Sequence, residues 1–78
     1  MPRYNIKAEW DEEAGVWVAS SDEVPGLATG ADTFEALIEK LRAVIPELLE
    51  ENGLLAADTE DVSFAVLAER VEHARRAA

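Results

Sequence analysis

The clearest pattern in the chain is an amphipathic helix between residues 32 and 53. Apolar side chains recur there at spacings of three and four and so line one helix face: Phe34, Leu37, Ile38, Leu41, Val44, Ile45, Leu48 and Leu49. Asp32 is expected to cap the first turn, with Glu35 completing a capping box, and Gly53 is expected to end the helix. Pro46 removes one internal hydrogen bond, but the apolar face continues in phase beyond it, so one kinked helix is predicted.

Two stretches before the helix predict a β-hairpin. In the first, apolar and polar residues alternate with the period of a half-buried strand: Tyr4, Ile6, Ala8 and Trp10 against Arg3, Asn5, Lys7 and Glu9. The second covers Val16–Ser20, and the acidic segment Asp11–Gly15 is the expected loop. If Trp10 faces Val16 across the loop, Trp10 lies beneath the helix and Trp17 lies on the opposite sheet face; a one-residue bulge would reverse this.

The remaining elements are shorter. Pro25 and Gly26 suit the centre of a type II turn, and residues 27–30 predict a brief third strand at a sheet edge. Residues 62–71 are ambiguous, because their apolar positions fit a strand and a helix almost equally well. We expect one domain over residues 1–78, with an ordered core at about 3–71 and a frayed tail at 72–78.

Charge and composition narrow the function. The 78 residues include 17 acids and 7 bases, which give a net charge of −10. Phosphate backbones repel such a chain, so we expect no direct nucleic-acid binding, whereas a basic protein partner would be attracted. A simpler interpretation is that the acids only keep a small protein soluble. No apolar run is long enough for a membrane span and no signal peptide is apparent, so a cytoplasmic location is expected.

Candidate chemistry is sparse. The chain has no Cys and a single His, His73, so an ordinary zinc site or a thiol nucleophile cannot be assembled. Nothing in the spacing places Ser20, Ser21 or Ser63 beside His73 in a catalytic triad, and the glycines are scattered turn residues. We therefore expect no enzyme activity and no catalytic, cofactor or metal site.

The order of motifs resembles the HicB-type antitoxins. Residues 22–37, Asp-Glu-Val-Pro-Gly-Leu-Ala-Thr-Gly-Ala-Asp-Thr-Phe-Glu-Ala-Leu, are similar to the family signature of a Pro-Gly turn, a short strand and a helix start. They differ by an extra residue before Pro25 and before Asp32, and Glu35-Ala36 comes one position early. Together with the Trp-flanked hairpin and residues 39–49, the resemblance covers about residues 4–71 and points to a short, uncharacterised HicB-like subfamily.

The resemblance implies an α+β fold of the order βββαβ, a truncated relative of the ribonuclease H architecture. Residues 62–71 would then be a strand parallel to the first, reached by a right-handed crossover. The sheet order would be three, two, one, four, with the helix on one face and the other face free. The metal-binding carboxylates that ribonuclease H chemistry needs are not convincingly present.

The implied function is neutralisation of HicA, a small basic toxin that cuts messenger RNA, by direct contact. The residues expected at the partner interface are Trp17, Glu9, Asp22, Glu23, Leu27 and Thr29. HicB antitoxins usually carry a C-terminal DNA-binding module, for which we expect no room after residue 71. The free sheet face and the edge strand also predict self-association. The alternative is a solitary homo-oligomeric domain, a dimer or tetramer, with no toxin partner and no catalytic activity.

Overall fold

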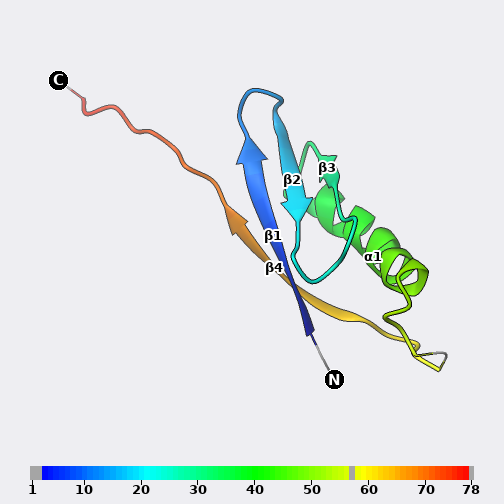
Figure 1. Ribbon diagram of the computed structural model, residues 1–78. Coiled ribbons are helices and arrows are strands. Elements are labelled where there is room, and N and C mark those ends of the chain that lie inside the picture. Colours follow the sequence, from blue (N-terminus) through cyan, green and yellow to red (C-terminus); the bar gives the residue numbers. More distant parts are fainter. Residues whose placement is uncertain (1–2, 57, 78) are drawn as a thin grey trace.

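One helix packed on a four-stranded sheet makes up the computed structural model, which describes residues 3–56 and 58–77 (Figure 1). The elements follow in the order β1 (Arg3–Asp11), β2 (Val16–Ser20), β3 (Thr29–Ala31), α1 (Phe34–Glu51) and β4 (Ser63–Glu69). Residues 1, 2, 57 and 78 lie outside the described residues. The predicted domain 1–78 and the predicted tail 72–78 can therefore be compared with the structure only up to residue 77. No described helix has the length and apolar character that crossing a membrane requires.

The sheet has the predicted topology. Its order is β3-β2-β1-β4, with antiparallel pairs between β1 and β2 and between β2 and β3, and a parallel pair between β1 and β4. The βββαβ fold expected from the resemblance is therefore confirmed. The ambiguous segment 62–71 is a strand over Ser63–Glu69, because its backbone pairs with β1 along its whole length.

The predicted hairpin register is wrong by one residue. Trp10 pairs with Trp17, and Asp11, which was expected in the loop, pairs with Val16. The loop is a four-residue turn closed by the Gly15 N–H, which donates to the Asp11 carbonyl over 2.8 Å, and Gly15 has a φ of +70°. A shift of one residue moves every side chain of a strand to the other face, so Trp10 and Trp17 share the face that α1 covers.

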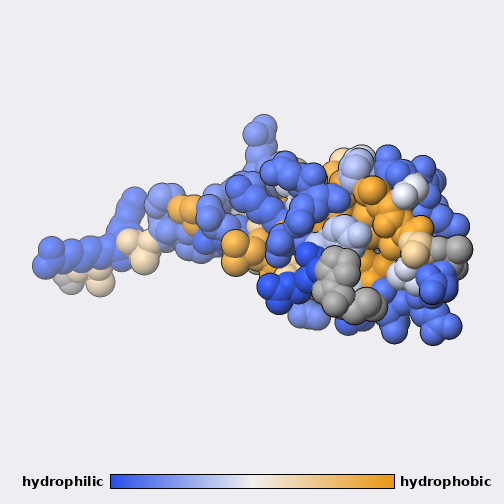
Figure 2. Space-filling model, turned by 60° about the horizontal axis from the view of Figure 1, so that its bottom comes forward, coloured by the Kyte–Doolittle hydropathy of each residue, from blue (hydrophilic) through white to orange (hydrophobic). Residues whose placement is uncertain are grey.

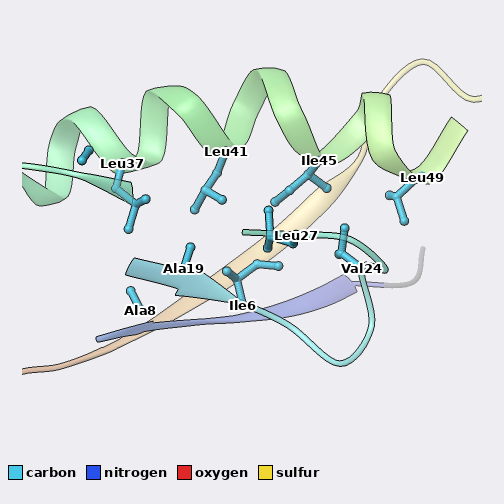
Figure 3. Packing of buried hydrophobic residues seen from close by; sticks show 10 residues of the cluster. Ile6, Ala8, Ala19, Val24, Leu27, Leu37, Leu41, Ile45 and Leu49 are labelled. Carbon is cyan, nitrogen blue, oxygen red and sulfur yellow. The ribbon is translucent and has the colours of Figure 1, made fainter. Parts of the chain in front are cut away.

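The core lies between α1 and that sheet face (Figure 3). Four helix residues at intervals of four have no exposed surface: Leu37, Leu41, Ile45 and Leu49. They face small or branched residues of the sheet and of the loop before β3: Ile6, Ala8, Ala19, Val24, Leu27 and Ala31. Each fully buried leucine contributes about 1.5–3 kcal/mol relative to an exposed one, so this row is the main source of stability.

The helix ends are set by local hydrogen bonds. The N-cap is Thr33, whose Oγ1 accepts from the Ala36 N–H over 3.1 Å, so the predicted Asp32–Glu35 capping box is wrong by one residue. A threonine hydroxyl at this position can satisfy a free N–H of the first turn, as the Asp32 carboxylate was expected to do. At the other end the Gly53 N–H donates to Glu50 and the Leu54 N–H to Leu49, the bonds of a Schellman motif.

Two further predictions are confirmed. Pro46 lies inside a single helix and does not divide it, while the kink expected there stays a prediction. The Leu27 N–H donates to the Val24 carbonyl over 3.2 Å and Gly26 has a φ of +82°, as a type II turn through Pro25-Gly26 requires.

Candidate protein-binding surfaces

The six residues predicted at a partner interface lie in different environments. Leu27 is 8% exposed and belongs to the core. Trp17 is half-buried on the helix side, where its ring meets Trp10 edge-on at 5.5 Å between centroids and Phe34 at 5.6 Å. Thr29 is half-buried in β3 opposite Ala19. These three stabilise the domain, and the incorrect register is the reason that Trp17 was expected on the free face.

The three acidic candidates are exposed. Glu9 lies in β1 and pairs with Lys7 at 3.2 Å. Asp22 and Glu23 lie in the loop after β2, where Glu23 Oε1 accepts from the Asn5 N–H over 2.7 Å. One carboxylate oxygen of Glu23 therefore takes the place of a strand partner for β1.

The sheet face turned away from α1 is called the open face here. Its side chains alternate with the buried ones along three strands: Arg3, Asn5, Lys7, Glu9 and Asp11; Val16, Val18 and Ser20; Ser63, Ala65, Leu67 and Glu69. Two large hydrophobic residues are exposed on it, Val18 at 39% and Leu67 at 77%. Leu67 was missed from the sequence. Its alternation with Phe64 and Val66 would have identified it once residues 63–69 were assigned to a strand.

Carboxylates gather at the hairpin end of the open face. Glu9, Asp11 and Glu12 line a hollow together with Val18 and Ser20. In the parallel register Glu69 lies directly beside Glu9, so two like charges neighbour each other across the strands. The three carboxylates that line this hollow, Glu9, Asp11 and Glu12, are called the acidic hollow below, together with the exposed Val18 and the neighbouring Glu69. It presents negative charge beside an apolar side chain, which suits a basic protein surface.

A second hollow on the open face collects the other acidic candidates. Asp22 and Glu23 line it with Lys7, Ala65 and Leu67. The structure thus brings Asp22 and Glu23 close to Leu67, but not into the acidic hollow around Glu9.

The helix side is only partly covered. The Cα atoms of α1 approach those of β2 and β3 within 8 Å, but none in β1 or β4 among the described residues. A groove between α1 and β4 remains, lined mainly by half-buried apolar side chains: Phe34, Ile38, Val62, Phe64 and Val66, with Arg42 at its edge.

Hydrophobic surface gathers on the body of the molecule, whereas the protruding segment is mostly hydrophilic (Figure 2).

No group of side chains suited to hold a metal ion occurs in the described part of the chain. Within residues 3–56 and 58–77, no three His, Cys, Asp or Glu side chains are grouped to hold a metal ion, and no buried side-chain polar atom lacks a hydrogen-bond partner. An open hollow beside the α1–β4 connection is lined by Tyr4, Leu54 and the exposed acids Asp58, Glu60 and Asp61. Its carboxylates face solvent, so it offers no enclosed site for a small molecule.

Comparison with known proteins identifies a matching family and a similar solved structure. A family model described as a domain of unknown function, DUF1902, matches residues 3–77. A solved structure of the hypothetical protein TTHA1013 from the extremely thermophilic bacterium Thermus thermophilus is similar, with a TM-score of 0.71 and 44% sequence identity. The match covers 96% of this chain and 100% of that one. No curated protein matches this chain.

Proposed function

This chain belongs to the DUF1902 family of domains of unknown function, and we propose from its surface that it is a protein-binding module. It would neutralise a small basic mRNA-cleaving toxin by direct contact. The resemblance of residues 22–37 to the HicB signature supports this proposal, as does the βββαβ fold that the resemblance implied. This role would be exercised in the cytoplasm, where messenger RNA is translated.

The observation that carries the proposal is the acidic hollow of the open face. Glu9 and Glu69 are neighbours across β1 and β4, and among the described residues the Lys7 ammonium forms an ion pair with Glu9. Two adjacent carboxylates repel each other in the free chain, and an arginine or lysine from a partner would relieve that repulsion. Val18, 39% exposed beside them, supplies an apolar contact of the kind found at the centre of interfaces.

The mechanism would be masking. A protein that cuts RNA must first bind the phosphate backbone, and it does so with arginine and lysine side chains. Carboxylates on the open face would pair with those side chains and exclude the RNA, while the net charge of −10 would speed the encounter. No group of this chain has to react with RNA in such a mechanism.

The test is an RNA-cleavage assay with a small basic HicA-like protein encoded beside this chain. Cleavage is followed while this chain is added up to equal molarity, and it is expected to stop. The double variant Glu9→Gln/Glu69→Gln keeps the side-chain shape but removes both charges. It is expected to raise the concentration needed for half inhibition by about tenfold and to weaken the salt dependence.

The matched control is Glu47→Gln/Glu50→Gln, which removes the same charge from exposed helix positions. It should inhibit as the unchanged chain does. Equal weakening by both double variants would show that net charge alone matters and would remove the acidic hollow from the proposal. No inhibition by the unchanged chain would overturn the toxin-neutralising function itself.

A second candidate function is favoured by a different observation. Among the described residues no strand pairs with the outer edge of the seven-residue β4, which suits a homo-oligomeric domain without a toxin partner.

A further inference from the structure

The edge strand β4 has the features of a strand that pairs with another chain. It lies at the end of the sheet order, and no strand pairs with its outer side within the described part of the chain. Its seven residues, Ser-Phe-Ala-Val-Leu-Ala-Glu, include no proline, glycine, lysine or arginine, the residues that usually protect an edge. Leu67 is 77% exposed, the most exposed of the large hydrophobic residues described.

The strand continues into an exposed arm. Residues 70–77, called the arm, have no regular secondary structure and are all exposed, and they extend away from the body (Figure 1). Its first residue is tied to the sheet, since the Arg70 guanidinium lies 4.1 Å from the centre of the Trp10 ring. Val71 is 66% exposed. Residues 71–77 are all exposed in a single copy of the chain.

The segments before and after β4 in the sequence carry opposite charge. The arm carries three arginines and one glutamate, a net charge of +2, while the rest of the chain has sixteen acids and four bases, a net charge of −12. The segment just before β4 holds Asp58, Glu60 and Asp61. The sequence around this strand is therefore acidic at its beginning and basic at its end, and it is self-complementary when two copies run antiparallel.

We propose that two copies of this chain form a two-fold symmetric dimer through antiparallel pairing of their β4 strands. Centring the pair on Leu67 places the two Leu67 side chains against each other on the open face. This contact buries the large hydrophobic side chain that is most exposed among the described residues. The same register puts Arg76 of each copy opposite Asp58 of the other, and His73 opposite Asp61. The two sheets become continuous, and each arm lies along the acidic segment 58–61 of the second copy.

This inference deepens the second candidate function by naming the surface, and it does not depend on a toxin partner. The experiment is sedimentation equilibrium of the full chain at several concentrations in low and high salt. The chain is expected to be a dimer whose dissociation increases with salt, since exposed charge pairs are screened. Leu67→Lys should yield a folded monomer, because a charge at the edge blocks pairing. Val18→Lys, the same kind of change at another exposed position of the open face, should leave the dimer intact.

A charge exchange tests the register without touching the folded body. Arg76→Glu changes only the arm and is expected to weaken the dimer by about tenfold or more, because the two-fold axis repeats the Arg76–Asp58 pair. Adding Asp58→Lys, the residue opposite Arg76 in the proposed register, should restore it. A chain that is monomeric at every concentration would overturn both homo-oligomerisation and the β4 interface. A dimer that survives Leu67→Lys and the arm variant would overturn only the β4 interface.

Discussion

The two edges of the sheet are built in opposite ways. At one edge β3 has three residues and lies against α1, and the Lys40 ammonium donates to the Gly30 carbonyl over 2.5 Å. At the other edge β4 has seven residues, lies beyond the reach of the α1 backbone and leaves Leu67 exposed. The first edge is shortened and covered by a charged side chain, two usual ways of preventing strand addition, while the second has neither.

The difference assigns stability and association to separate halves of the molecule. The half formed by α1, β2 and β3 contains most of the buried side chains, so changes there should affect unfolding. The outer side of β4 contributes little burial in one copy, so changes there should affect pairing with another copy. Matched substitutions in the two halves test this division, from the largest expected effect to the smallest.

The largest contrast is between two leucine truncations. Leu41→Ala empties a fully buried position under α1 and is expected to lower the free energy of unfolding by about 2–5 kcal/mol. Leu67→Ala makes the same chemical change at a position 77% exposed and should stay within about 0.5 kcal/mol. Urea unfolding at low protein concentration, where association contributes least, measures both. Similar losses for the two variants would contradict the division into halves.

A smaller effect is expected at Gly30 in the protected edge. A Cβ added there would lie 2.9 Å from the Trp17 backbone oxygen, so the strands must separate or shift. Gly30→Ala should therefore cost about 1–3 kcal/mol, the usual range for overpacking. Ser63→Ala at the opposite edge is the control, because Ser63 is exposed and the change removes only a hydroxyl. A stable Gly30→Ala variant would mean that the β2–β3 pair is looser than described.

The helix cap gives a still smaller effect. Thr33→Ala removes the hydroxyl that accepts from the Ala36 N–H and should cost about 1 kcal/mol in thermal or urea unfolding. Asp32→Ala, the change at the residue expected from the sequence to be the cap, should cost less than about 0.5 kcal/mol. If Asp32→Ala lowered the free energy of unfolding more than Thr33→Ala, Asp32 would be the N-cap, as the sequence predicted.

The elements with a strong period were predictable from the residues. The helix stripe determined which side chains are buried, and even its end at Gly53 follows from a left-handed glycine with a φ of +67°. The fourth strand needed more than the residues. Its apolar positions fit either period, and the pairing with β1 that settles it joins segments about sixty residues apart. Only the family resemblance supplied that long-range contact.

The candidate surface was less predictable, because it depends on single-residue register. The loop after β1 could hold four or five residues, and that choice alone moved Trp17 from the open face to the core side. The pairing of Glu9 with Glu69 likewise follows from the parallel register and has no local signal. Glu9 was still predicted as an interface residue, on charge and face alone. Leu67 was not, because its strand was uncertain.

The smallest expected effect lies where β4 leaves the sheet. The Arg70 guanidinium stacks over Trp10 and also meets the Glu72 carboxylate, and its side chain is 43% exposed. Arg70→Gln should lower the free energy of unfolding by about 0.5–1 kcal/mol, the range for an exposed cation–π contact. Arg70→Lys should lose less, because an ammonium can still lie over the ring.

Tryptophan fluorescence should change in both variants, whereas the circular dichroism signal of the Trp10–Trp17 pair should persist, since that contact lies within the hairpin. Loss of the pair signal on Arg70→Gln would show that the end of β4 holds the hairpin together, and the two halves would then be coupled through Trp10.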